Sequence, residues 1–105
     1  METREDLHDL IEKTTGRKAY FQPPENLTMV YPCTVYELNG LYPRHANNRN
    51  YVQRPYYQMT YITRDPEDPN IQKLADLPQC AMGRPFSSEN LHHYPYTIYY
   101  GTRIS

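Results

Sequence analysis

The sequence predicts an α+β domain, in which two helices lie on one face of a mostly antiparallel β-sheet in the order α-β-β-β-α-β-β. Three observations predict this class. Two segments have a capping signal followed by apolar residues at helical spacing, one near the N-terminus and one past the middle of the chain. Other segments alternate in runs rich in Val, Thr and Tyr, which is typical of strands. The predicted strands are grouped rather than alternating one by one with helices, which indicates an antiparallel sheet with helices on one face.

Length and composition indicate one small folded unit. The chain has 105 residues and a formal net charge of −1, so residues 1–105 are expected to form a single domain. Only 18 residues are Leu, Ile, Val or Phe, a content at which disorder is common. The low net charge and the twelve Tyr, whose rings can cover a sheet, instead indicate a folded domain. The apolar stretches are too short for a membrane span, and the acidic N-terminus lacks the apolar segment of a signal peptide, so a cytosolic setting is expected.

The first helix is expected over residues 3–16. Thr3 and Asp6 resemble a capping box, and Leu7 and Ile11 lie one turn apart on the same helical face. Gly16 is expected to end the helix. A short strand at residues 20–22 follows, and the two prolines after it end that strand because proline cannot donate to a sheet ladder.

Two longer strands are expected at residues 28–38 and 51–63, paired as a hairpin around a turn-rich loop at 39–50. Pro32 indicates an edge position or a bulge in the first strand. That strand has apolar residues on both sides, so we expect a helix to cover one face and another subunit to cover the second. The alternation places one set of residues on each side: Met29, Tyr31, Cys33 and Val35 on one, and Val30, Thr34, Tyr36 and Leu38 on the other.

The second helix is expected to begin at Asp65-Pro66, where Asp caps the helix and Pro takes its first position. An alternative start at Asp68-Pro69 follows the same logic. Pro78 is expected to end the helix. A short strand is then predicted at residues 80–86, a turn or brief helical start at 87–90, and a last strand at 93–100.

Few residues have the pattern of a catalytic or metal site. Cys33 and Cys80 lie on predicted strands, where a buried thiol is more common than a catalytic one, although a neighbouring His could activate either. The sequence has no Cys-x-x-Cys and no His-x-x-x-His. His92 and His93 are adjacent on an extended segment, so they project to opposite faces. We therefore expect no enzyme activity, no metal and no cofactor.

Two other patterns have alternative explanations. Asp65, Glu67 and Asp68 could bind a divalent cation, but helix capping explains the same residues. The twelve Tyr, with Arg residues near them, could stack the bases of a single-stranded nucleic acid. Because the chain has no net positive charge, contacts between proteins explain the Tyr content better.

Five ordered segments resemble a family of small tailed-bacteriophage proteins, the tail completion or tail terminator proteins that join head to tail. The resemblance extends over nearly the whole chain, and none of its motifs is catalytic. The segments are residues 20–24 (YFQPP), 31–36 (YPCTVY), 61–66 (YITRDP), 77–80 (LPQC) and 84–93, which holds RPF and ENLHH.

The resemblance implies a non-enzymatic virion protein of the phage neck, assembled in the host cytoplasm. It implies a ring, usually of six copies, that caps the tail tube, meets the head-to-tail connector proteins, and lets genomic DNA pass through its lumen without specific binding. A head-completion connector on the portal side is the alternative within this class, and a single-stranded nucleic-acid-binding module is the alternative from another class. The residues expected at the interfaces are Tyr36, Tyr42, Arg44, Arg49, Tyr51, Tyr56, Tyr57, Arg84, His92, Tyr99 and Tyr100.

Overall fold

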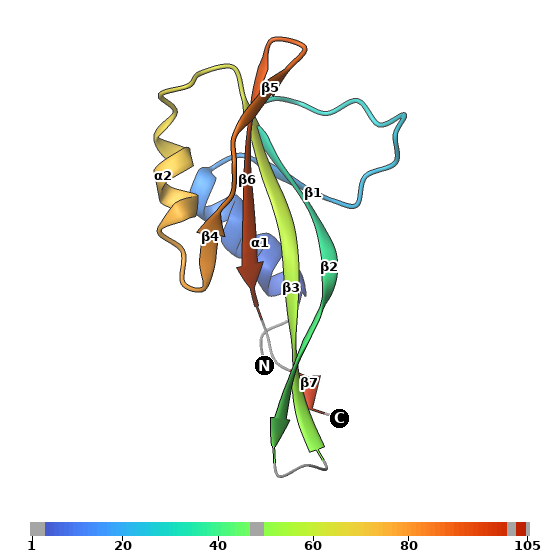
Figure 1. Cartoon of the computed structure of the whole chain (residues 1–105). Helices are drawn as coiled ribbons and strands as arrows, with labels where there is room; N and C mark the ends of the chain where they lie inside the picture. The colour runs from blue at the N-terminus through green and yellow to red at the C-terminus, as the bar shows by residue number, and fades with distance from the viewer. Residues whose placement is uncertain (1–3, 47–49, 101–102, 105) are drawn as a thin grey trace.

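The computed structural model describes residues 4–46, 50–100 and 103–104, with side chains described for residues 4–39 and 55–100 (Figure 1). The helices are α1 (Arg4–Thr15) and α2 (Pro69–Ala75). The strands are β1 (Lys18–Phe21), β2 (Cys33–Ala46), β3 (Asn50–Thr63), β4 (Cys80–Met82), β5 (Phe86–Ser88), β6 (Leu91–Tyr99) and β7 (Arg103–Ile104). The predicted α+β class and element order are confirmed, with two short strands, β5 and β7, in addition.

The seven strands found among the described residues belong to one sheet. The order across it is β1-β2-β3-β6-β4, while β5 pairs with β6 and β7 pairs with β3. β1 and β2 are parallel, and the other pairings are antiparallel. β2 and β3 form the long hairpin that the alternation predicted. Within the described part of the chain, no helix has the length and apolarity that crossing a membrane requires.

α1 forms because its apolar residues recur at helical spacing. Leu7 and Ile11, one turn apart, are both fully buried. Gly16 ends the helix as predicted, since it has a φ of +67° and its N–H donates to the Glu12 carbonyl at 2.8 Å. The predicted capping residue Thr3 lies outside the described residues.

α2 begins later than the start that the sequence favoured. Asp68 is the N-cap, and its carboxylate accepts the Asn70 N–H at 2.9 Å. The alternative start is therefore confirmed, and the start at Asp65 is wrong. The Asp65 carboxylate is used in the preceding turn, where it accepts the Glu67 N–H at 2.9 Å. The helix also ends before the predicted stop at Pro78.

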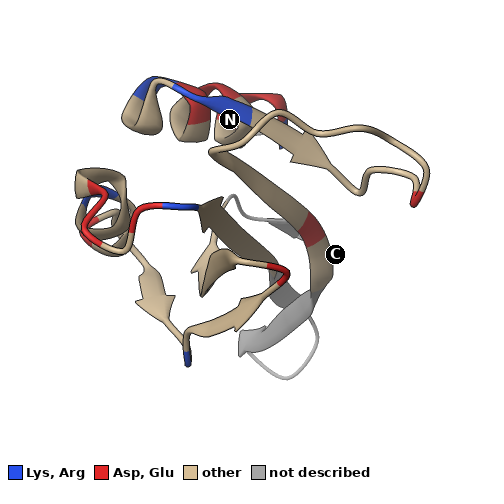
Figure 2. Cartoon of the chain, turned by 90° about the horizontal axis from the view of Figure 1, so that it is seen from above, with Lys and Arg blue, Asp and Glu red and all other residues tan. Residues whose placement is uncertain are grey.

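Both helices pack on one face of the sheet, which holds the larger core, and they lie close to each other in the view from above (Figure 2). Hydrogen bonds join the elements at this junction. Asn70 Nδ2 donates to the Thr15 carbonyl at 2.9 Å and to the Tyr61 hydroxyl at 3.1 Å, and Tyr61 donates to Asp68 Oδ2 at 2.7 Å. The buried core residues are Leu7, Ile11, Ala19, Tyr36, Tyr57, Met59, Tyr61, Leu74, Tyr96 and Ile98.

The opposite face of the sheet carries a smaller apolar cluster. Its buried residues are Cys33, Ile62 and Leu91, and Met29 and Tyr31 pack against them. Since Met29 and Tyr31 belong to the segment between β1 and β2, the chain itself covers this part of the face. A second subunit was expected there, and that expectation is corrected for the region of this cluster.

β2 begins later in the sequence than predicted. Residues 28–32 are not in a strand, and the Tyr31–Pro32 peptide bond immediately before β2 is cis. Pro32 has no N–H to donate to a ladder. The strand therefore begins at Cys33, with Pro32 before it and not inside it.

β2 also continues through residues that were predicted to form a loop. The ladder with β3 runs on from Gly40↔Tyr56 to Ala46↔Asn50, so most of the segment 39–50 is strand. The register shifts between Leu38 and Gly40. The Asn-Gly pair that indicated a turn lies at a bulge, where a glycine is also common.

Beyond this bulge the hairpin extends past the rest of the molecule, as Figure 1 shows. We call residues 40–46 and 50–55 the arm. The pairing of β3 with β6 ends at Tyr56↔Tyr99, and along the arm the described partner of β3 on that side is β7, through Val52↔Ile104. The molecule measures 49 × 27 × 23 Å, and the arm accounts for its elongated shape.

The turn predicted over residues 87–90 is confined to Glu89 and Asn90, because Ser87 and Ser88 belong to β5. β5 and β6 form a hairpin with Ser88 opposite Leu91. The two residues between them, Glu89 and Asn90, have φ of 53° and 65°. Positive φ at both positions is what a type I′ turn requires, and this turn suits a tight hairpin.

Candidate interaction surface

Two of the residues predicted at interfaces belong to the core. Tyr36 is fully buried and Tyr57 is 7% exposed. The Tyr36 hydroxyl lies 2.7 Å from His8 Nδ1 and accepts a hydrogen bond from Arg4 at 3.4 Å. Burial raises the pKa of Tyr36, and the bond from Arg4 opposes this shift in part. We therefore leave Tyr36 and Tyr57 out of the candidate surface, because their alternation places them on the helix-covered face.

Tyr56 and Tyr99 lie where the arm leaves the domain. They are register partners on β3 and β6, both half-buried, with ring centroids 5.6 Å apart. Tyr100 is also half-buried, and its N–H donates to the Pro55 carbonyl at 3.1 Å. The rings of Tyr56 and Tyr99 contact each other at the base of the arm and keep part of their surface exposed to solvent. Partial exposure of this kind is expected for Tyr at a contact with another protein.

Three further predicted residues, Tyr42, Arg44 and Tyr51, lie on the arm. The register pairs Arg44 with Val52 and Tyr51 with His45. Their side chains are outside the description, and Arg49 lies outside the described residues altogether. The structure thus groups these three predicted positions on one projecting hairpin.

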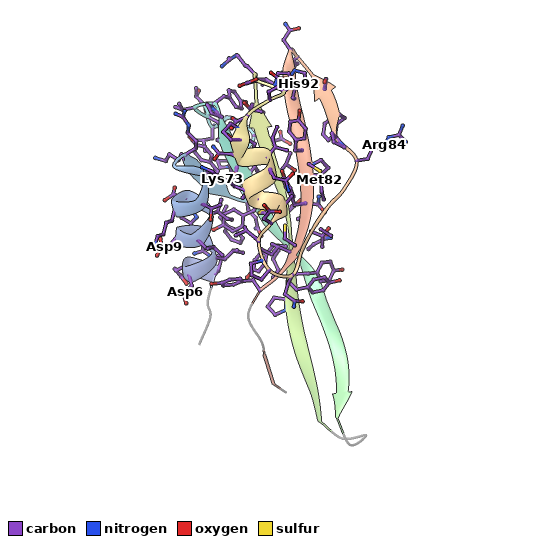
Figure 3. The ribbon with its side chains drawn as sticks, turned by 90° about the vertical axis from the view of Figure 1, so that its left-hand side faces the viewer. Asp6, Asp9, Lys73, Met82, Arg84 and His92 are labelled. Carbon is purple, nitrogen blue, oxygen red and sulfur yellow. The ribbon has the colours of Figure 1, made fainter. Side chains whose placement is uncertain are left out.

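The β5–β6 hairpin carries His92, and the loop before it carries Arg84, which is exposed and points away from the domain in Figure 3. His92 is half-buried, with Nδ1 3.2 Å from Ser87 Oγ of the facing strand. A shallow hollow of about 380 Å³ is lined by Ser87, Ser88, Glu89, Asn90 and His92. The hairpin tip therefore offers polar groups to a partner, at the opposite end of the molecule from the arm.

The exposed apolar side chains were missed by the sequence analysis. Val30 is 69% exposed and Leu27 41% exposed, both on the segment between β1 and β2. Phe86 is 54% exposed, although its ring stacks on His93 with centroids 4.7 Å apart. Alternation placed Val30 inside a strand, so the pattern gave no signal that it would be exposed.

The outer side of α1 is acidic. Glu5, Asp6 and Asp9 are exposed, and Figure 3 shows Asp6 and Asp9 projecting from α1 away from the sheet. Glu12 is partly covered, since it accepts the Ala19 N–H at 3.0 Å and lies 3.3 Å from His8 Nε2. The first turns of α1 therefore present carboxylates to solvent.

The two cysteines that the sequence analysis considered for catalysis do not have the environment of a reactive thiol. Cys33 is buried, Cys80 is half-buried, and both are free thiols. Burial raises the pKa of each to about 11, so both stay protonated at neutral pH, whereas a thiolate is the reactive form. Among the described residues, no group of three or more His, Cys, Asp or Glu side chains is placed to hold a metal ion.

The carboxylates considered for cation binding do not act as one group. Asp68 caps α2 and also accepts the Tyr61 and Thr63 hydroxyls at 2.7 and 3.1 Å. Burial acts to raise the pKa of Asp68, but these bonds and the one from the Asn70 N–H outweigh burial, and the pKa is lowered. Asp65 is used in the turn before α2.

The chain is thus a small α+β domain with three surface features. They are a projecting hairpin, partly exposed Tyr at the base of that hairpin, and an acidic helix. Comparison with models of protein families gives no match to this chain, and comparison with curated proteins gives none either. The function is therefore argued from these surfaces and from the resemblance of the five ordered segments.

Proposed function

We propose that this chain is a structural protein of the neck of a tailed bacteriophage virion, which forms a ring that closes the tail tube and joins it to the head connector. The ring is expected to hold six copies, with genomic DNA passing through it without specific binding. The proposal assigns the chain no catalytic step, no cofactor and no membrane association. Its partners are further copies of itself, the tail tube protein and the connector proteins.

The observation that carries the proposal is the arm. A two-stranded ribbon that extends past its own domain exposes backbone and side chains to neighbours on both faces. Strands at the edges of a sheet are common sites of association between chains. The half-buried Tyr56 and Tyr99 at its base suit such a contact, because Tyr is enriched at protein interfaces.

The position of the arm also fits a protein that lies between two partners, the tail tube and the head connector. The arm lies at one end of the 49 Å long axis, and the β5–β6 hairpin lies at the other end. A subunit with different surfaces at its two ends can contact two different partners at once. Contacts between unlike surfaces of copies close into a ring when the rotation between copies is suitable.

Electron microscopy of the purified chain mixed with isolated tail tubes tests this proposal. We expect rings at one end of each tube. A matched variant has residues 43–53 replaced by Asn-Gly, which closes the hairpin after the Tyr42↔Arg54 pair with a two-residue turn. This variant should fold, as measured by circular dichroism, and should leave the tube ends bare.

Other outcomes would replace the proposal. Binding only to portal-filled capsids would favour the head-completion connector. Binding to single-stranded oligonucleotides that weakens steeply as salt rises would favour the nucleic-acid-binding module. A chain that binds neither tubes, capsids nor oligonucleotides would contradict all three functions.

A further inference from the structure

The arm and α1 carry opposite charges in uninterrupted runs. Between Leu38 and Tyr56, the stretch that holds the arm, the sequence has three Arg and no Asp or Glu. Between Glu5 and Glu12 it has four carboxylates and no Lys or Arg. Because the whole chain has a net charge of only −1, these runs are segregated charges on a nearly neutral molecule. Segregation of this kind gives each copy two surfaces that attract each other.

Two carboxylates of α1, those of Glu5 and Asp9, are exposed at positions one helical turn apart. Figure 3 shows Asp9 on the side of the helix that faces away from the sheet, and Glu5, one turn before Asp9, shares its helical face. The neighbouring base, Arg4, reaches Glu5 at 3.3 Å but lies against the sheet, with its guanidinium 4.4 Å from the Phe21 ring centroid. The outer side of the first turns therefore keeps an excess of negative charge.

The spacing of charges on the arm matches that on the helix. Arg44 is paired with Val52, so Arg54 lies two residues further along the neighbouring strand. Such diagonal neighbours are about 7 to 8 Å apart. On α1, Glu5 and Asp9 are one turn apart, a separation of about 6 Å. The backbone spacing of the two Arg positions is therefore close to that of the two carboxylates.

The arm points away from the helix of its own chain, because it continues along the long axis past the end of α1 (Figures 1 and 3). We infer that the arm of one copy docks on the outer side of α1 of a second copy, with the strand positions of Arg44 and Arg54 opposite the helix positions of Glu5 and Asp9. The inference rests on the proposed function, since it specifies the contact by which copies would form the ring. A nucleic acid could use the arm alone, whereas a second copy uses both charged surfaces.

Charge reversal tests the contact in the purified full-length chain. One variant combines Arg44→Glu with Arg54→Glu, and a second combines Glu5→Lys with Asp9→Lys. The matched controls reverse as many exposed charges elsewhere: Lys18→Glu with Lys73→Glu, and Glu25→Lys with Glu67→Lys. Circular dichroism checks that each variant folds, and sedimentation velocity at low and high salt measures self-association.

We expect the wild-type chain to self-associate at low salt and to dissociate as salt rises. Each reversed variant alone should have a dissociation constant for self-association raised by about tenfold or more, because attraction becomes repulsion. An equimolar mixture of the two variants should associate again, since the acidic arm of one meets the basic helix of the other and the native pair also forms. The controls should behave as the wild type does.

Several results would overturn the inference. They are a wild-type chain that stays monomeric at low salt, reversed variants that associate normally, a mixture that does not recover, and controls that are equally impaired. Oligonucleotide binding that is lost in the Arg variant without any self-association would assign the arm to nucleic acid. If these variants associate normally and still form rings on tail tubes, the inference fails and the proposed function stands. If the mixture recovers but the wild type ignores tail tubes, the proposed function fails and the contact stands.

Discussion

Replacing Asp68 by Ala is expected to destabilise the fold strongly, because one carboxylate serves three donors. The change removes the N-cap of α2, a loss of about 1 kcal/mol. It also removes the acceptor of two hydroxyls, those of the fully buried Tyr61 and of Thr63, which is 2% exposed. Each buried donor without a partner costs about 1 kcal/mol or more. The expected loss in the free energy of unfolding is thus about 3 kcal/mol.

Urea denaturation followed by far-UV circular dichroism at pH 7 measures this loss. A domain of this size has a total stability of about 5 to 15 kcal/mol, so 3 kcal/mol is a large share. The matched control is Asp65→Ala, which removes an exposed carboxylate from the turn before α2 and should cost about 0.5 kcal/mol or less. Asp68→Asn keeps a capping oxygen for Asn70 and should cost about 1 kcal/mol.

The order of the three variants in free energy of unfolding tests whether Asp68 is the N-cap of α2. If Asp65→Ala proves as costly as Asp68→Ala, the helix begins at the earlier aspartate and the described N-cap is wrong. If Asp68→Ala costs less than about 1 kcal/mol, the two hydroxyls have found other partners, and the network does not hold α2 to β3.

Further predictions concern pH, the helix end, the core tyrosine and the thiols. Because the folded pKa of Asp68 is lowered, its contribution is present above the unfolded pKa and is lost as pH falls; acid titration of stability should therefore be shallower for Asp68→Asn than for the wild type. Gly16→Ala should lower the stability measured in urea by about 1 kcal/mol, since φ is +67° while nothing lies within 4 Å of an added Cβ; an unchanged stability would contradict that φ. Tyr36→Phe should cost about 1 kcal/mol in the same assay by removing the hydroxyl held by His8, and should leave self-association unchanged. Alkylation at neutral pH should be slow at Cys33 in the folded chain and fast in urea, and mass spectrometry showing rapid folded-state labelling there would contradict its burial.

Local sequence signals predicted the helices and the antiparallel core of the sheet. Gly16 ended α1 as expected, because a positive φ is a property of one residue and can be read locally. The start of α2 could not be decided in this way, since Asp65 and Asp68 are both followed by Pro and have equal capping potential. The hydroxyls of Tyr61 and Thr63 select Asp68, and they reach its carboxylate only because of the turn between β3 and α2.

The candidate surface was harder to predict than the fold. Asn39-Gly40 has the composition of a turn, and only pairing with a distant strand makes it a bulge within β2. The same pairing converts a predicted loop into the arm. Tyr36 and Tyr56 have similar alternating contexts, and which of them is buried depends on the face that the helices cover. The segregated charges are visible in the sequence. Their role in a contact between copies could be inferred only once the structure showed that the arm projects from the domain.

The continuity of β3 from the core to the arm has a mechanical consequence. Ladder hydrogen bonds run perpendicular to antiparallel strands. A pull along the arm therefore loads many of these bonds together in shear, and none of them can be opened first as in a zipper. Any load received at the far end of the ribbon is transmitted through Tyr57, Met59 and Tyr61 directly to the layer beneath both helices. A force on the arm is thus expected to reach the core through the paired strands and not through a separate linker.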